Sequence, residues 1–146
     1  MRPDVYLDTS SLAKWYINEP FSEEVEAFIQ EKGPVAVSSL TVTEMRSLLA
    51  RRYRMNEMDA EIVMKVWATF MDDLRQGFVI RIPFTDTMFD SAAGLLATMT
   101  GHSLRTLDAL HLAFMKEESL ESIATSDRIM ADAAQSLNFE VVRFGC

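Results

Sequence analysis

The chain has 146 residues, of which 49% are hydrophobic and 25% are charged, a composition typical of a single soluble globular domain. No apolar run approaches the roughly 18 residues that a transmembrane helix needs. The N-terminus has no basic segment followed by an apolar core, so we expect a cytoplasmic protein with no membrane partner. The one cysteine, Cys146, excludes an internal disulfide and, with two histidines, leaves too few ligands for the usual structural zinc sites.

The net charge of −8 argues against a simple basic surface that binds nucleic acid. The charges are nevertheless unevenly distributed, because four arginines lie within nine residues at Arg46, Arg51, Arg52 and Arg54. Local fields matter more than net charge for a substrate that binds in a cleft. An anionic substrate is therefore not excluded.

Strand and helix patterns alternate along the chain. Strands are predicted at residues 4–8, 35–38, 78–82, 122–125 and 140–144, and helices at 11–17, from 22 to the Gly33-Pro34 break, 41–54, 57–76, 86–100, 106–118 and 127–137. Short strands separated by helices predict a mostly parallel five-stranded sheet that is covered on both faces. The fold class is therefore α/β, and we expect one three-layer α/β/α domain over residues 1–146.

Four acidic residues lie where predicted strands end or where the next helices begin. Asp8 follows the first strand, and Asp127 follows the fourth. Glu44 lies in the first turn of the helix after the second strand, and Asp108 lies near the start of the helix over 106–118. Right-handed crossovers place all these positions at the same edge of a parallel sheet. We therefore expect these residues, called the four acids below, to converge.

Each acid alone has a structural explanation. Glu44 stands three residues after Thr41, which is the capping-box spacing. Asp8 and Asp127 are suitable N-caps, and Asp108 would complement a helix dipole. A cluster of all four is harder to explain without a cation, because two like charges about 4 Å apart repel by roughly 4 kcal/mol at an effective dielectric near 20. Oxygen ligands favour Mg²⁺ or Mn²⁺, and such a site suits phosphodiester hydrolysis by a metal-activated water.

Several segments also resemble the ordered motifs of PIN-domain proteins. They are residues 6–12 (YLDTSSL) with Glu19-Pro20 and Glu23-Glu24 after them, Thr43-Glu44-Met45, residues 107–113 (LDALHLA) and residues 124–127 (ATSD). The resemblance spans almost the whole chain, and the length suits the VapC type, the toxins of bacterial and archaeal toxin–antitoxin pairs. Two positions depart from the pattern: Met130, where leucine is commoner, and Asn138, where glycine often stands.

The resemblance implies a Mg²⁺- or Mn²⁺-dependent endoribonuclease that a small antitoxin holds silent. Under it, the four acids are the catalytic and metal-binding residues. Ser10 and Thr125 match polar positions that support the site. Two arginines are candidates for contact with the RNA substrate or the antitoxin. Arg51 lies two helical turns after Glu44, and Arg105 lies three residues before Asp108, although either could simply be solvated.

We expect neither histidine to act as a general base. His111 shares a helix face with Asp108, and we expect a packed or supporting histidine there rather than a general base. His102 follows Gly101 in a turn and is expected to be solvated.

The predicted helix over 57–76 is apolar around more than half of its circumference. Packing on one sheet face needs a stripe only somewhat wider than 100°. We therefore expect a second buried surface on the helix around Met58–Leu74, supplied by a second subunit in a homodimer or by an antitoxin helix. The alternative is a locally thicker core.

Two other functional classes share part of this pattern. A response-regulator receiver domain also gathers acids at strand ends around Mg²⁺, but it needs a lysine after a late strand, and none of the four lysines is so placed. The stronger alternative is a PIN-fold module that binds RNA or protein with weak or no nuclease activity. A complete set of four acids argues against that alternative without excluding it.

Overall fold

The computed structural model describes residues 2–146. Its elements in chain order are β1 (Val5–Leu7), α1 (Thr9–Tyr16), α2 (Ser22–Lys32), β2 (Val35–Ser38), α3 (Ser39–Arg54), α4 (Ala60–Gln76), β3 (Val79–Ile82), α5 (Asp86–Thr98), α6 (Thr106–Glu117), β4 (Ser122–Thr125), α7 (Arg128–Ser136) and β5 (Glu140–Arg143). Every strand pairing is parallel, and the strand order is β3-β2-β1-β4-β5. The predicted parallel five-stranded α/β fold is confirmed.

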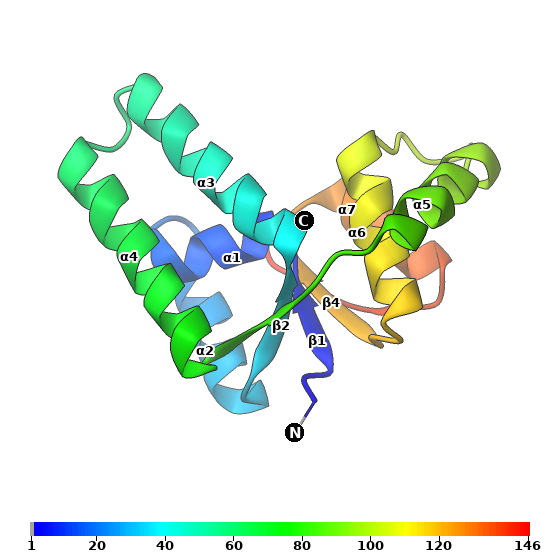
Figure 1. Ribbon diagram of the computed structural model, residues 1–146, viewed down its shortest axis with the longest axis horizontal. Coiled ribbons are helices and arrows are strands. Elements are labelled where there is room, and N and C mark those ends of the chain that lie inside the picture. The colour runs from blue at the N-terminus through cyan, green and yellow to red at the C-terminus, as the bar shows by residue number, and fades with distance from the viewer. Residues whose placement is uncertain (1) are drawn as a thin grey trace.

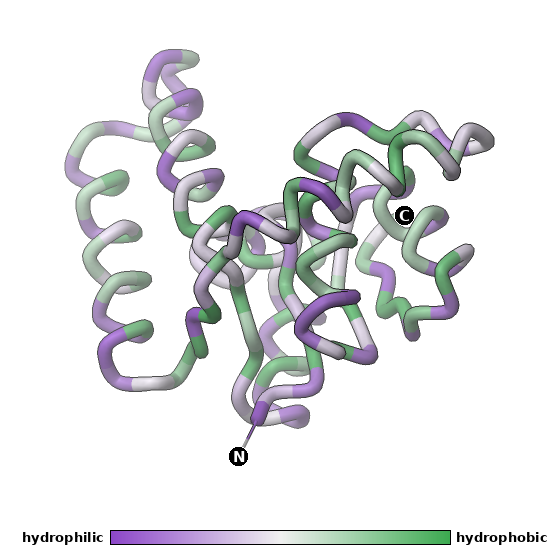
Figure 2. Tube along the Cα trace, turned by 45° about the vertical axis from the view of Figure 1, so that its right-hand side comes forward, coloured by the Kyte–Doolittle hydropathy of each residue, from purple (hydrophilic) through white to green (hydrophobic). Residues whose placement is uncertain are grey.

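Helices cover both faces of this sheet because side chains alternate along its strands. Val5 and Leu7 of β1 point to one face, where they pack with residues of α1, α2, α3 and α4. Tyr6, between them, points to the other face, where it packs with residues of α5, α6 and α7. The two helical layers lie on opposite sides of the strands in Figure 1, and Figure 2 shows that the strands between them are largely hydrophobic.

The strand order creates a crevice at the centre of the sheet. From β1 the chain adds β2 and β3 on one side and β4 and β5 on the other. Helices that leave β1 and β4 therefore diverge to opposite faces and leave a gap beyond the carboxyl ends of these two strands. In open parallel sheets this is where ligands bind. Asp8 follows β1 and Asp127 follows β4, so both residues border the crevice.

Helix α3 begins earlier than the sequence pattern predicts. Ser38, the last residue of β2, is its N-cap, and the Ser38 hydroxyl accepts a hydrogen bond from the Thr41 backbone N–H at 3.2 Å. Thr41 completes this capping box by accepting from the Ser38 backbone N–H at 3.3 Å. The alternative capping box of Thr41 with Glu44 is therefore not formed, and Glu44 lies in the second turn of α3 rather than in the predicted first turn. This leaves the Glu44 carboxylate free for the site.

Most of the broad apolar surface of α4 belongs to the core. Val63 and Phe70 are buried, and Val66, Trp67, Met71 and Leu74 pack against the same cluster. The large hydrophobic residues of α4 that are exposed are Ile62 and Met64, next to Tyr53 and Met55 at the tip of the α3–α4 hairpin. A thicker core thus explains most of the pattern, and the candidate partner surface shrinks to the hairpin tip. Within residues 2–146, no helix is both long and apolar enough to span a membrane.

Candidate active site

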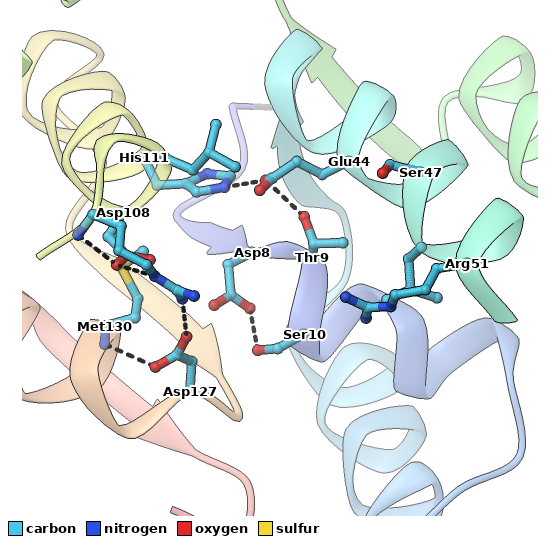
Figure 3. A pocket seen from close by; sticks show the side chains of 13 residues that line it. Asp8, Thr9, Ser10, Glu44, Ser47, Arg51, Asp108, His111, Asp127 and Met130 are labelled. Atoms are coloured by element: carbon cyan, nitrogen blue, oxygen red, sulfur yellow. Dashed lines mark hydrogen bonds and ion pairs between the residues drawn. The ribbon is translucent and has the colours of Figure 1, made fainter. Parts of the chain in front are cut away.

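The four acids line one cavity of about 400 Å³ at the carboxyl edge of the sheet. The predicted polar residue Ser10 and the predicted arginines Arg51 and Arg105 line the same cavity, as do Thr9 and His111. Thr125, the other predicted support, is fully buried behind the wall. Figure 3 shows carboxylates from both helical layers facing a common space.

Asp8 is the buried centre of this wall. It is the N-cap of α1, and its Oδ1 accepts hydrogen bonds from the Ser11 backbone N–H at 3.1 Å and the Ser10 hydroxyl at 2.7 Å. Its Oδ2 accepts from the Thr125 hydroxyl at 2.5 Å. Burial raises the pKa of Asp8, and the hydrogen bonds from Thr125 and Ser10 only partly oppose this shift. The fold therefore holds the carboxyl group of Asp8 without neutralising its charge.

Ser10 and Thr125 connect Asp8 to the turn that carries Asp127. The Ser10 hydroxyl also accepts from the Ser126 backbone N–H at 2.8 Å. The Thr125 hydroxyl accepts from the Asp127 backbone N–H at 3.0 Å. Both predicted supports thus contact Asp8 directly and hold the β4–α7 turn against it.

Glu44 enters the cavity from α3. Its Oε1 accepts a hydrogen bond from the Thr9 hydroxyl at 2.9 Å and another from His111 Nε2. Burial favours the protonated form, but the contacts with His111 and Thr9 outweigh it and lower the pKa of Glu44. Glu44 is therefore an ionised carboxylate at neutral pH. Its Oε2 has no hydrogen-bond partner among residues 2–146.

Asp108 and Asp127 form the opposite wall, and each is anchored by one oxygen. Asp108 Oδ2 accepts from the Arg105 backbone N–H at 3.0 Å, at the start of α6. Asp127 Oδ1 caps α7 by accepting from the backbone N–H groups of Ile129 and Met130 at 2.9 and 3.2 Å. The capping roles that the sequence suggested for these acids are real. They do not remove the acids from the cavity, because only one oxygen of each does the capping.

The two predicted arginines behave differently. The Arg105 guanidinium lies between two acids, with Nε 3.3 Å from Asp108 Oδ2 and Nη2 3.7 Å from Asp127 Oδ2. Arg51 lines the cavity from α3 and is exposed, and it forms no ion pair with any residue that the structure describes. Figure 3 shows its side chain on the α3 side of the cavity, across from Asp108 and Asp127. Arg51 is therefore the available cation of the cavity wall.

A buried polar group that the sequence analysis above does not predict lies behind Glu44. The Tyr6 hydroxyl contacts the hydroxyls of Ser38 and Thr41, each at 2.9 Å, and His111 Nδ1. Burial raises the pKa of Tyr6 above its ordinary value, so its phenol stays protonated. One signal was available in the sequence: Tyr6 precedes Asp8 by two residues, and the period of a strand places both on one face.

Divalent cations suit the donor set of this cavity. All four acids offer oxygen, and three of them leave one carboxylate oxygen without a hydrogen bond from residues 2–146, which is the hard-ligand chemistry of Mg²⁺ or Mn²⁺. Across residues 2–146, no three acidic, histidine or cysteine side chains are grouped closely enough to hold an ion by themselves. Mg²⁺ does not need such a cage, because it usually binds through one or two carboxylates and retains several waters. The residues present therefore fit a hydrated cation.

Fold and cavity together define a PIN domain, and the chain belongs to the PIN domain family, which matches residues 5–136. It is 29% identical over 141 residues to Ribonuclease VapC46 of Mycobacterium tuberculosis, covering 94% of this chain and 95% of that protein.

Solved structures share the fold at lower identity. VapC20 of M. tuberculosis, a toxin that cleaves the sarcin–ricin loop, superposes with a TM-score of 0.70 at 17% identity, covering 88% of this chain and 94% of VapC20. VapBC2 from Rickettsia felis, bound to a DNA fragment from their promoter, gives 0.68 at 13% identity, covering 95% and 97% of the two chains.

Proposed function

We propose that this protein is a metal-dependent endoribonuclease of the VapC type, the toxin of a toxin–antitoxin pair. One observation carries the proposal: four carboxylates from separate elements line one cavity, and in the described part of the chain Arg105 is the one arginine that pairs with any of them. Such an excess of negative charge is destabilising unless a cation binds. The similarity to the VapC46 ribonuclease supports the same conclusion.

Residues on both walls of the cavity would hold the cation. Asp8 and Glu44, held by hydroxyl and imidazole donors, would orient the cation and its waters on the β1 and α3 side. Asp108 and Asp127 would complete the set from α6 and α7. Mg²⁺ or Mn²⁺, when bound, supplies an activated water and stabilises the charge that develops on the phosphodiester.

RNA would enter across the exposed side of the cavity. Arg51 is free to contact a phosphate, and such contacts position a nucleic acid without reading its sequence. Arg105 would become available once a cation takes over its pairing with Asp108 and Asp127. The selection of a particular RNA then depends on the shape of the surrounding surface.

The partner we propose is a small antitoxin, because VapBC2 from R. felis is a pair of this kind. Its docking surface would include the hairpin tip, where Tyr53, Met55, Ile62 and Met64 are exposed. A homodimer is also proposed, with the same tip as one candidate interface. Light scattering of the free protein and of the co-expressed pair would distinguish a homodimer interface at the tip from an antitoxin docking surface.

Cleavage of total cellular RNA tests the enzyme. The wild-type protein should produce new RNA ends with Mg²⁺ or Mn²⁺ and none after chelation, and Asp8→Asn should produce none in either condition. Mapping of the 5′ ends after brief expression would identify the RNA. If the wild-type protein cleaves no cellular RNA with either metal, the enzyme proposal is wrong and a binding module becomes the better description.

A further inference from the structure

His111 lies at the junction of the two helical layers. It is 3% exposed, and its two ring nitrogens contact residues from different parts of the chain. Nε2 reaches Glu44 Oε1 on α3, and Nδ1 reaches the Tyr6 hydroxyl on β1. Figure 3 shows the ring extending from α6 toward Glu44 across the top of the cavity. Both nitrogens of this buried ring are therefore satisfied, and their partners come from two different elements, α3 and β1.

The contacts form a closed ring that begins and ends on α3. Ser38 and Thr41, at the start of α3, hold the Tyr6 hydroxyl, and Tyr6 holds His111. His111 then holds Glu44, one turn further along α3. This closed set of contacts fixes α6, which covers one face of the sheet, against α3, which covers the other. A buried polar network in which every member has a partner confers rigidity of this kind.

Proton counting gives the direction of the contact with Glu44. An ionised carboxylate has no proton to donate, so His111 Nε2 must carry the hydrogen. Thr9 donates to the same oxygen, Oε1. Both donors therefore act on one oxygen of Glu44, and Oε2 has no hydrogen-bond partner among residues 2–146.

The same histidine also sets the width of the site. Asp108 lies three residues before His111 on α6, which places both on one helix face. Holding His111 against Glu44 thus fixes the separation between two of the four acids. Sub-ångström placement of ligands determines how well a small ion such as Mg²⁺ binds.

We infer that His111 is a positioning residue that fixes Glu44 and the spacing between α3 and α6 for cation binding, with Tyr6 holding its ring. The inference rests on the proposed function of the cavity, but it makes separate predictions. Metal-ligating carboxylates depend on their hydrogen-bond donors, and loss of such a donor typically weakens metal binding about 10- to 100-fold.

Mn²⁺ binding to the full chain, measured by calorimetry, tests the role without RNA. His111→Leu should weaken binding about 10- to 100-fold. His111→Gln keeps an N–H donor near the Nε2 position, so it should restore binding to within a few-fold of wild type. His102→Gln, at the other histidine, is the matched control and should change nothing. With RNA, His111→Leu should lower kcat and leave KM unchanged, since Arg51 is untouched.

The protonation of the His111 ring gives a second readout that needs no variant to fold. Nitrogen-15 NMR should find Nε2 protonated, and the ring of half-buried His102 provides a reference in the same spectrum. A neutral ring protonated only on Nδ1 would overturn the inference. Tyr6→Phe should leave the fold intact but broaden or split the His111 signals, because the ring loses its second partner.

The outcomes separate the two proposals. If His111→Leu folds and binds Mn²⁺ as wild type does while RNA is still cleaved, the positioning role is wrong and the nuclease stands. If the wild-type protein binds no Mn²⁺ and cleaves no RNA, both proposals are wrong. Weakened binding that glutamine restores, together with a protonated Nε2, supports the role.

Discussion

Burial affects two carboxylates in this protein, Asp8 and Glu19, whose pKa values are nevertheless displaced in opposite directions. Glu19 accepts from Arg52 Nη2 at 2.9 Å and from Lys14 Nζ at 3.1 Å. Burial alone would raise its pKa, but these two cations outweigh burial and lower it. Asp8 receives only hydroxyl and backbone donors, and burial raises its pKa.

Under the proposed function, this difference in pKa distinguishes an acid that stabilises the fold, Glu19, from one that serves the metal site, Asp8. Where Glu19 joins α1 to α3, the chain supplies two positive partners, so its charge stabilises the fold. Within residues 2–146, no lysine or arginine forms an ion pair with Asp8. Its ionised form therefore destabilises the unliganded protein, which is the usual relation between stability and function at a catalytic site. A cation from solution would be the missing partner.

The largest effect should come from Asp8→Asn. Cleavage should fall by about 1000-fold, the order seen when a group that stabilises transition-state charge is removed. Folding stability should nevertheless rise at neutral pH, because the amide keeps the capping oxygen and removes an unpaired buried charge. Thermal unfolding of the metal-free proteins, alongside the RNA assay, checks both halves of the prediction.

The pH dependence of this gain follows from the raised pKa. The ordinary value for this carboxyl is 3.8, and the folded value lies above it. The contribution of Asp8 to stability is therefore fully present below 3.8 and is lost as pH rises through the folded pKa. Wild type and Asp8→Asn should be equally stable in acid and should diverge toward neutral pH. A variant that is less stable than wild type at neutral pH would contradict the comparison.

Arg105→Gln should have the next largest effect. Arg105 is the one cation that pairs with the cavity acids in the described chain, and its side chain is 73% exposed. An exposed pair is weak, so the arginine should compete only modestly with a divalent ion. Mn²⁺ should bind about 5-fold more tightly to the variant, as measured by calorimetry.

Arg51→Ala provides the matched comparison, because Arg51 lines the same cavity without an acidic partner. Its Mn²⁺ affinity should equal that of wild type. The KM for RNA should rise and its salt dependence should become shallower, since one phosphate contact fewer releases fewer counterions. Tighter Mn²⁺ binding in Arg51→Ala would show that the cavity responds to general charge rather than to the Arg105 pairing.

The sequence predicts the fold and the meeting of the acids well, because both follow from local patterns. Strand ends, helix starts and a right-handed crossover are enough to bring Asp8 and Asp127 to one edge. The sequence pattern predicts the start of α3 at residue 41 rather than at Ser39, because both Ser38 and Thr41 are good N-cap residues. The strand end decides between them, since Ser38 pairs with Ile82 in β3 and leaves the sheet there.

Contacts between distant elements could not be read in the same way. The contact of His111 with Glu44 depends on how closely α6 approaches α3, and no spacing in the chain encodes this distance. The pairing of Arg105 with Asp127 likewise needs the turn after β4. The sequence overestimates the exposed apolar surface of α4 because it does not show that Trp67 and Leu74 pack against the core.

The smallest effect is expected at Glu19, where the charge serves only the fold. Glu19→Gln should lower the free energy of unfolding by roughly 0.5–1 kcal/mol at neutral pH and leave RNA cleavage unchanged. Its folded pKa lies below the ordinary 4.5, so its stabilising contribution is present above 4.5 and is lost as pH falls through the folded value. Urea unfolding should show Glu19→Gln less stable than wild type at neutral pH and equal to it in acid, so the difference at neutral pH has the opposite sign from that of Asp8→Asn. Glu57→Gln removes the same charge from a more exposed partner of Arg52, 3.4 Å from its Nε, and should change stability by only a few tenths of a kcal/mol. If Glu19→Gln and Asp8→Asn instead shift stability in the same direction with pH, the opposite pKa displacements of these two acids are not what distinguishes them.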